Sequence, residues 1–120
     1  MRERQAALRY GRIVYAWVSD RNGYAKLRPA LVLTPDVSLD PTAPIVAAAI
    51  TTTFPEPPGP HCVKLPWHPS GRVSTGLRQR SAVVTNWLTT ISPSDVVGYG
   101  GDVPRPIMDE IQRKLTELNE

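Results

Sequence analysis

The side chains in this sequence that could do chemistry are of the types that bind phosphate or stack on bases. Arginine, threonine, serine, asparagine, tryptophan and tyrosine stand near the ends of expected strands. The sequence has no glycine-rich phosphate loop and no G-x-S-x-G nucleophile turn. His61 and His68 have no acidic residue beside them, and Cys62 is the only cysteine. We therefore expect no metal site, no disulfide and no bound cofactor.

This set of residues lacks a clear carboxylate base, but it suits RNA cleavage in which the substrate supplies the nucleophile. The 2′-hydroxyl can attack its neighbouring phosphate, and the protein then holds the in-line geometry and stabilises negative charge on the phosphorane. A guanidinium suits that role because it is planar, always charged and bidentate toward phosphate. Arg28 is the best candidate because it precedes Pro29 at the start of an expected buried strand. An arginine in solvent beside a core strand is the alternative.

Three threonines follow an alanine-rich run and form a second candidate group. Thr51 and Thr53 fall on one face of an expected strand and Thr52 on the other, because strand side chains alternate. Their hydroxyls could donate to a phosphate oxygen. Threonine is common in strands, so an ordinary structural role stays open.

Composition and charge limit the classes of protein that could position these groups. The chain has 120 residues, enough for one domain, and 13 prolines exclude long helices from most of it. Residues 1–101 hold 11 basic and 6 acidic residues, a charge of +5, and residues 102–120 hold 3 and 5, a charge of −2. The basic body suits a polyanion, with an ordinary surface as the alternative. Neither a signal peptide nor a membrane span is expected, so we predict a cytoplasmic protein.

Local patterns predict a mainly β (α+β) fold. Strands are expected over 10–18, 29–34, 45–53, 61–65 and 81–90, with an irregular strand or turn over 97–101. Asn22-Gly23 indicates a hairpin turn. An amphipathic helix is expected over 102–119, and Trp17 is expected in the core. We predict a small, strongly curved antiparallel barrel over residues 10–120 with this helix on one open side, preceded by a flexible arm over residues 1–9.

Three segments together resemble the MazF/PemK (Kid/CcdB-like) toxin superfamily. They are Gly11–Val14 followed by Arg28–Leu33, then Ile45–Thr51, and finally Ser81–Val84 with Leu88–Ile91. The family's pattern is G-D-I-V, a hairpin, R-P-x-L-V, a core strand that ends in threonine, and S-x-V…x-T-I. The resemblance covers residues 10–118, nearly the whole chain.

The resemblance implies an SH3-like barrel, a homodimer and a cognate antitoxin partner. It also implies metal-independent, sequence-specific cleavage of single-stranded RNA that leaves a 2′,3′-cyclic phosphate and a 5′-hydroxyl. The matched functional positions are Arg28, which would stabilise the phosphate transition state, and Thr51, which would hydrogen-bond a non-bridging oxygen. The general base stays unassigned, because an arginine remains charged at neutral pH.

The sequence departs from the family pattern at two places. Arg12 replaces the acid of G-D-I-V, and Asn86-Trp87 stands where many members have an acidic residue followed by glutamine. Trp87 could stack on a base or lie in the core, and Trp67 is the better stacking candidate. The residues expected to bind RNA are Tyr24, Lys26, Thr52, His61, Trp67, Ser81, Asn86 and Trp87. Two alternatives stay open, a non-catalytic RNA- or peptide-binding barrel and a gyrase-targeting relative, although R-P-x-L-V argues against the second.

Overall fold

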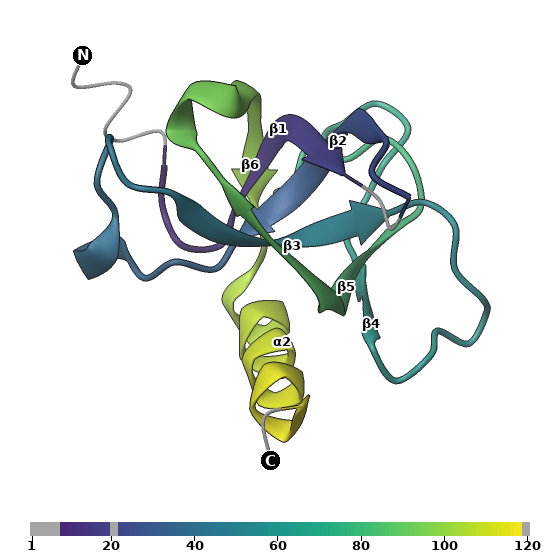
Figure 1. The fold of residues 1–120 in the computed structure, drawn as a ribbon. Helices are drawn as coiled ribbons and strands as arrows, with labels where there is room; N and C mark the ends of the chain where they lie inside the picture. The colour runs from purple at the N-terminus through teal and green to yellow at the C-terminus, as the bar shows by residue number, and fades with distance from the viewer. Residues whose placement is uncertain (1–7, 20–21, 119–120) are drawn as a thin grey trace.

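A computed structural model describes residues 8–19 and 22–118 of the chain. Six strands and one helix make up the fold (Figure 1). The elements are β1 (Arg12–Ser19), β2 (Ala25–Val32), the 3-10 turn η1 (Asp36–Ser38), β3 (Ile45–Thr51), β4 (Cys62–Leu65), β5 (Ser81–Ile91), the 3-10 turn η2 (Pro93–Asp95), β6 (Val96–Asp102) and α2 (Arg105–Leu118).

The strands form one curved antiparallel sheet in the order β4-β5-β3-β2-β1-β6. The predicted mainly β fold with a C-terminal helix is confirmed, but the sheet is not closed into a ring by pairing of β4 with β6. The loop that follows β4 crosses to β6 instead. There the backbone N–H groups of Gly101 and Asp102 donate to the carbonyls of Thr75 and Ser74, both at 2.9 Å. This loop therefore ties the two edge strands together without a ladder between them.

Both faces of the sheet are buried where the strands overlap. On the first face, side chains such as Ile13, Leu31 and Val83 pack with residues of α2. On the second face, Val14, Ala30 and other small or β-branched residues form a separate apolar cluster. Alternation along each strand sends neighbouring residues to opposite faces, so one short strand contributes to both clusters.

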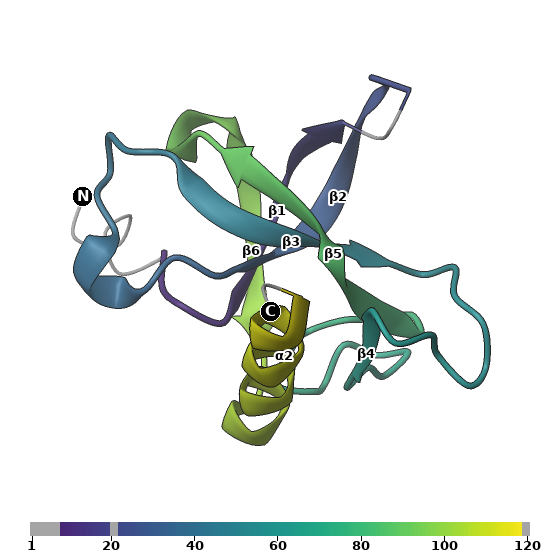
Figure 2. The ribbon, with the colours of Figure 1, turned by 60° about the horizontal axis from the view of Figure 1, so that its bottom comes forward.

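The helix α2 packs on the first face beside β4 and β5 (Figures 1 and 2). It begins at Arg105, so Pro104 precedes it and Pro106 lies in its first turn, where a missing N–H costs no helical bond. Met108 and Ile111 are its buried residues, and Leu118 at its C-terminal end is exposed. The predicted helix is correct in type and register, and its start lies three residues later than expected. No described helix is both long enough and apolar enough to cross a bilayer.

The hairpin of β1 and β2 extends past the rest of the sheet (Figure 2). At its far end Trp17 pairs with Leu27, and the tryptophan is 56% exposed. The expectation of a core tryptophan at position 17 is therefore wrong, because this part of the hairpin lies beyond the elements that cover the first face. Gly23, just before β2, has φ 83°, a left-handed conformation that favours glycine.

The predicted arm over residues 1–9 differs from the structure at its C-terminal end. Leu8 packs against the second-face cluster, and the Arg9 guanidinium bonds both carboxylate oxygens of Asp102, at 2.9 and 2.7 Å. These two residues thus belong to the folded domain. Residues 1–7, the remainder of the expected arm, lie outside the described residues.

Candidate functional site

The Arg28 side chain lies across the ring of Trp87 on the second face of the sheet. Its Cζ atom is 4.9 Å from the ring centroid, within the range of a cation–π contact. Both side chains are partly buried. Among the described residues the buried Nε of Arg28 has no hydrogen-bond partner, and no carboxylate lies within ion-pair distance of its guanidinium. A positive charge with no paired anion is therefore held at a partly covered position.

Arg28 lies inside β2 rather than at the start of a strand, which corrects the sequence-based prediction. The strand begins at Ala25, and Pro29 lies opposite Tyr15 of β1. A proline is tolerated there because β2 pairs with β3 only from Ala30 onward, so one edge of the strand is unpaired at Pro29.

A bulge in β5 brings Trp87 to this place. Ala48 of β3 pairs with Leu88 of β5, and Ile50 pairs with Val83, so one residue of β3 faces four residues of β5. That one residue is Ala49, which is fully buried. Since β3 separates β2 from β5 in the sheet, Arg28 and Trp87 meet over a strand that presents only alanine there.

Thr51 lies at the same end of the sheet and on the same face as Arg28. The last residues paired between β2 and β3 are Ala30 and Ala49, and two positions further along each antiparallel strand are Arg28 and Thr51. Thr51 is partly buried. Its Oγ1 accepts the backbone N–H of Thr53 at 3.1 Å and donates to the Thr53 carbonyl at 3.2 Å. Neither of the two expected catalytic side chains is sealed in the interior.

The loop that leaves Thr51 is anchored by an ionic cluster that the sequence analysis missed. Oε2 of Glu56 accepts bonds from Lys64 at 2.9 Å and from Arg80 at 3.0 Å. The Arg80 guanidinium also lies over the ring of Phe54, with its Cζ 3.8 Å from the centroid. The hydrogen bonds from Lys64 and then Arg80 lower the pKa of the Glu56 carboxyl. No local pattern indicates this cluster, because Glu56 and Arg80 are 24 residues apart.

Lys26 shares the Arg28 side of β2, and Tyr24 precedes the strand. Lys26 pairs with Val18 and Arg28 with Ala16, and both partners belong to the second-face cluster. Lys26 and Tyr24 are exposed, as is Thr52 just after β3. These three expected RNA-binding residues lie on the segments that lead to or from Arg28 and Thr51.

The other expected RNA-binding residues are more dispersed. Asn86 is exposed beside Trp87, whereas His61 and Trp67 flank opposite ends of β4 and are not brought together. The Ser81 side chain is buried and its hydroxyl donates to the carbonyl of Gln79 at 2.8 Å, so the hydroxyl is used within the fold. Only part of the expected set therefore converges on one site.

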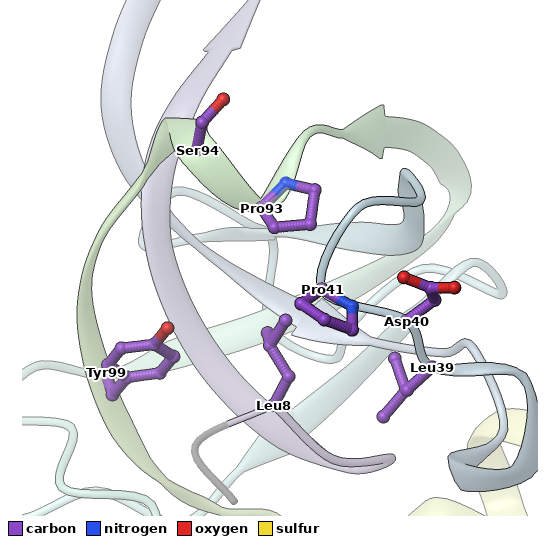
Figure 3. Close-up of a pocket in the computed structure, with 7 residues that line it drawn as sticks. All are labelled: Leu8, Leu39, Asp40, Pro41, Pro93, Ser94 and Tyr99. Carbon is purple, nitrogen blue, oxygen red and sulfur yellow. The ribbon is translucent and has the colours of Figure 1, made fainter. Parts of the chain in front are cut away.

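A cavity of about 510 Å³ lies elsewhere, beyond the end of β5 (Figure 3). It is lined by Leu8, Leu39, Asp40, Pro41, Pro93, Ser94 and Tyr99. Among the described residues its lining has no arginine or lysine, and its carboxylate, Asp40, accepts bonds from Thr42 that lower the Asp40 pKa. In the described ranges, 8–19 and 22–118, no three His, Cys, Asp or Glu side chains converge as metal ligands would.

The geometry around Arg28 suits recognition of a phosphate group. A guanidinium without a paired carboxylate binds phosphate strongly, and partial burial reduces the screening of its charge by water. A threonine hydroxyl at the same end of the sheet can add a neutral donor. A guanidinium and a hydroxyl on one face of the sheet are donors of the kind that can bind an anion.

The family model for PemK-like, MazF-like toxins of type II toxin–antitoxin systems matches residues 9–118. The chain belongs to this family. The resemblance stated from sequence is thereby confirmed. A sequence comparison with curated proteins finds no match.

Solved structures show that this family member has the MazF fold. A crystal structure of MazF from Deinococcus radiodurans is 22% identical, with a TM-score of 0.72, and the match covers 93% of this chain and 96% of that one. An endoribonuclease in complex with its cognate antitoxin, from a mycobacterial species, is 23% identical with a TM-score of 0.71, covering 92% and 93%. Mycobacterium tuberculosis toxin MazF-mt6 is 23% identical with a TM-score of 0.67, covering 88% and 93%.

Proposed function

We propose that this PemK/MazF-like toxin is a metal-independent, sequence-specific endoribonuclease that cleaves single-stranded RNA, including mRNA. The observation that carries the proposal is the partly buried guanidinium of Arg28, which has no carboxylate partner in the described part of the chain. Family membership supports it, as does the endoribonuclease activity of relatives with this fold.

The reaction would be an internal transfer within the RNA. The 2′-oxygen attacks the adjacent phosphorus and loses its proton, while the bond from phosphorus to the 5′-oxygen breaks and that oxygen takes up a proton. The products are a 2′,3′-cyclic phosphate and a 5′-hydroxyl. Arg28 stabilises the charge that builds up on the phosphorane oxygens, and Thr51 donates to a non-bridging oxygen. The group that accepts the 2′-proton stays unassigned.

The exposed residues around this centre would carry the RNA strand. Lys26 and Tyr24 approach it from the hairpin, Thr52 from β3 and Asn86 from β5. Trp67, with its ring partly open to solvent, would stack on a base further along, beside the end of β4. His61 and Ser81 are the weakest members of the set, because they lie apart or buried.

We also propose that the toxin acts in the cytoplasm as a homodimer and is held inactive by a cognate antitoxin. The support for the antitoxin is the family itself and the mycobacterial relative in complex with its antitoxin. Growth arrest on induction, relieved by co-expression of the neighbouring small gene, would test this part.

Cleavage of a mixed-sequence single-stranded RNA in EDTA tests the nuclease proposal. Wild-type protein should cut at a few short sequences, and Arg28→Ala should lower the rate by at least about 100-fold while its circular dichroism stays unchanged. The matched control is Arg113→Ala, which removes an exposed arginine of α2 and should cut as fast as wild type. Unimpaired cleavage by Arg28→Ala would remove Arg28 from the mechanism.

A non-catalytic RNA-binding barrel is the second candidate, favoured by one observation. Asn86 and Trp87 replace the acidic residue and glutamine of many family members, so a group that could accept a proton is missing there. RNA that binds in a salt-dependent way but stays intact for hours would support this reading. Inhibition of gyrase supercoiling would instead support the gyrase-targeting alternative.

A further inference from the structure

We propose that Trp87 is a positioning residue for Arg28, and that it orients the guanidinium toward the scissile phosphate rather than stacking on a base of the RNA. The inference rests on the proposed nuclease function, and it deepens that function by assigning a role to one of the residues at which this chain departs from its family pattern. Four observations carry it: the ring contact, the buried Nε, the alanine beneath the pair and the bulge that holds the ring.

The ring contact fixes the plane of the guanidinium. Arg28 has a long side chain with many rotamers, and the described residues offer it neither a carboxylate nor a hydrogen-bond acceptor. Within the described residues, the guanidinium instead makes a cation–π contact with Trp87, whose ring centroid lies 4.9 Å from Cζ. Without the ring the guanidinium would sample several orientations, and in-line catalysis is sensitive to displacements of about 1 Å.

Burial of Nε points the guanidinium in one direction. An N–H that is buried without an acceptor is unfavourable, and the negative face of the indole ring offsets part of that cost. With Nε on the covered side, the two terminal nitrogens are the part of the group left to bind a phosphate. Trp87 thus supplies by its π-face the orientation that a carboxylate commonly gives an arginine, and it leaves the positive charge unneutralised.

A small residue of the sheet lies between the strands that carry the pair. Ala49 is the one residue of β3 opposite the four-residue bulge in β5, and it pairs with Ala30 of β2. Trp87 also packs against the second-face cluster, which includes Ala30 and Ala47. Contacts with Arg28 and with the core thus cover part of the Trp87 side chain. A base that stacks on the ring face under Arg28 must displace the guanidinium.

Substitutions at position 87 separate the two roles. At saturating enzyme, Trp87→Leu should slow cleavage of the mixed-sequence RNA by about 10- to 100-fold, because the guanidinium is no longer oriented. The Kd for RNA should change less than about threefold, since the charge remains. Trp87→Phe, which keeps an aromatic face, should restore cleavage to within about threefold of wild type. The matched control, Trp17→Phe, should leave both quantities unchanged.

A double-mutant comparison distinguishes an action of Trp87 through Arg28 from a general effect of Trp87 on the fold. Trp87→Leu should cause no further loss of cleavage when Arg28 is already alanine, because the tryptophan acts through the arginine. Base stacking by Trp87 predicts the opposite pattern: RNA binding weakens about tenfold or more with or without Arg28. That pattern would overturn the inference.

Nuclear magnetic resonance of the RNA-free protein tests the contact directly, and it does so even if Trp87→Leu fails to fold. The Nε–H proton of Arg28, identified by its loss in Arg28→Ala, should be shifted upfield by the ring in wild type and in Trp87→Phe. An unshifted proton in wild type overturns the inference. Wild-type protein that cuts no RNA overturns the proposed function instead, so the two failures are distinguishable.

Discussion

The hydroxyl of Thr51 accepts one hydrogen bond that holds its oxygen in place, and it donates one long hydrogen bond. The backbone N–H of Thr53 donates to Oγ1, whereas the bond from Oγ1 to the Thr53 carbonyl is 3.2 Å, long for a hydroxyl donor. The proton can therefore turn to a phosphate oxygen at little cost, while the oxygen stays in place. This local turn suits the donor role that we propose for Thr51.

Removal of this hydroxyl should affect the rate more than binding. We expect Thr51→Val to slow RNA cleavage by about 10- to 100-fold at saturating enzyme, because one donor to the phosphorane is lost. Thr51→Ser keeps the hydroxyl and the turn, and it should stay within about fivefold of wild type. Equal rates for the valine and serine variants, measured by single-turnover cleavage, would exclude a role for the hydroxyl.

At the scale of single residues, the sequence could nominate candidates but not their contacts. Arg28 and Thr51 stand out by residue type, by their place before Pro29 or after the alanine run, and by resemblance to the family pattern. The contact of Arg28 with Trp87 was not foreseeable, because it joins residues 59 positions apart through a bulge. The sequence leaves base stacking and a core position open for Trp87, and the structure shows it partly buried beneath the Arg28 guanidinium.

Strand β6 and the loop after β4 meet at a position where only glycine fits. A Cβ on Gly101 would overlap the carbonyl of Ser74, the same carbonyl that accepts the N–H of Asp102. Gly98, in the same strand, has its nearest neighbour at ordinary contact distance, the Tyr15 Cβ at 3.8 Å. These two of the three glycines in β6 thus differ in whether a side chain is tolerated.

We expect Gly101→Ala to lower the free energy of unfolding by about 1–3 kcal/mol, because the loop must move away from β6. Gly98→Ala should change it by less than about 0.5 kcal/mol. Urea denaturation followed by circular dichroism measures both. Similar stability of the two variants would show that the loop shifts at no cost.

At the scale of elements, local patterns predict most strands and the helix. They fail where pairing with a distant strand sets the boundary of a strand or the exposure of its side chains. Six strands and a C-terminal helix lie close to the expected ranges. The strand expected to begin at Pro29 begins at Ala25 instead, because the hairpin partner β1 extends the ladder past the proline. The exposure of Trp17 has a similar origin, since its strand continues beyond the covered part of the sheet.

An ion pair joins the beginning of the folded domain to the end of β6. Arg9, before β1, makes a bidentate contact with Asp102 at the end of β6, just ahead of α2. The hydrogen bond from Arg9 lowers the pKa of the Asp102 carboxyl, burial opposes this shift, and the charges of Arg9 and Arg12 add to it. The pair is about half-exposed, so we expect it to contribute no more than about 1 kcal/mol.

The pH dependence of stability should report this contact. Because the folded pKa of Asp102 lies below its unfolded value of about 3.9, its contribution is present above about pH 4 and is lost as pH falls through the folded pKa. Asp102→Asn should thus be less stable than wild type at pH 7 by up to about 1 kcal/mol, with the gap closing in acid. Thermal unfolding at several pH values measures it.

The exposed pair of Arg105 and Asp109 in α2 provides the comparison. Asp109→Asn should change the free energy of unfolding by less than about 0.5 kcal/mol at pH 7. Equal losses in the free energy of unfolding for Asp102→Asn and Asp109→Asn at neutral pH would show that the contact of Arg9 with Asp102 stabilises the fold no more than an exposed helix pair does.

The arrangement of the whole molecule was the least predictable from sequence. The small antiparallel β fold with a terminal helix was foreseeable, but the strand order was not, because β3 lies between β2 and β5 through pairings distant in the chain. The gap between the edge strands β4 and β6 is bridged by backbone hydrogen bonds from β6 to a loop. Residue types give no indication of such backbone contacts. The family resemblance supplied the architecture that periodicity could not.

The four-residue bulge in β5 serves two different neighbours. Val84 pairs with Cys62 of β4, and the buried Thr85 donates through its hydroxyl and its backbone N–H to the carbonyl of His61. The next two residues face another way: Asn86 is exposed, and Trp87 lies against the Arg28 guanidinium. One irregular segment of a strand therefore both secures the edge of the sheet and presents an aromatic ring to the arginine.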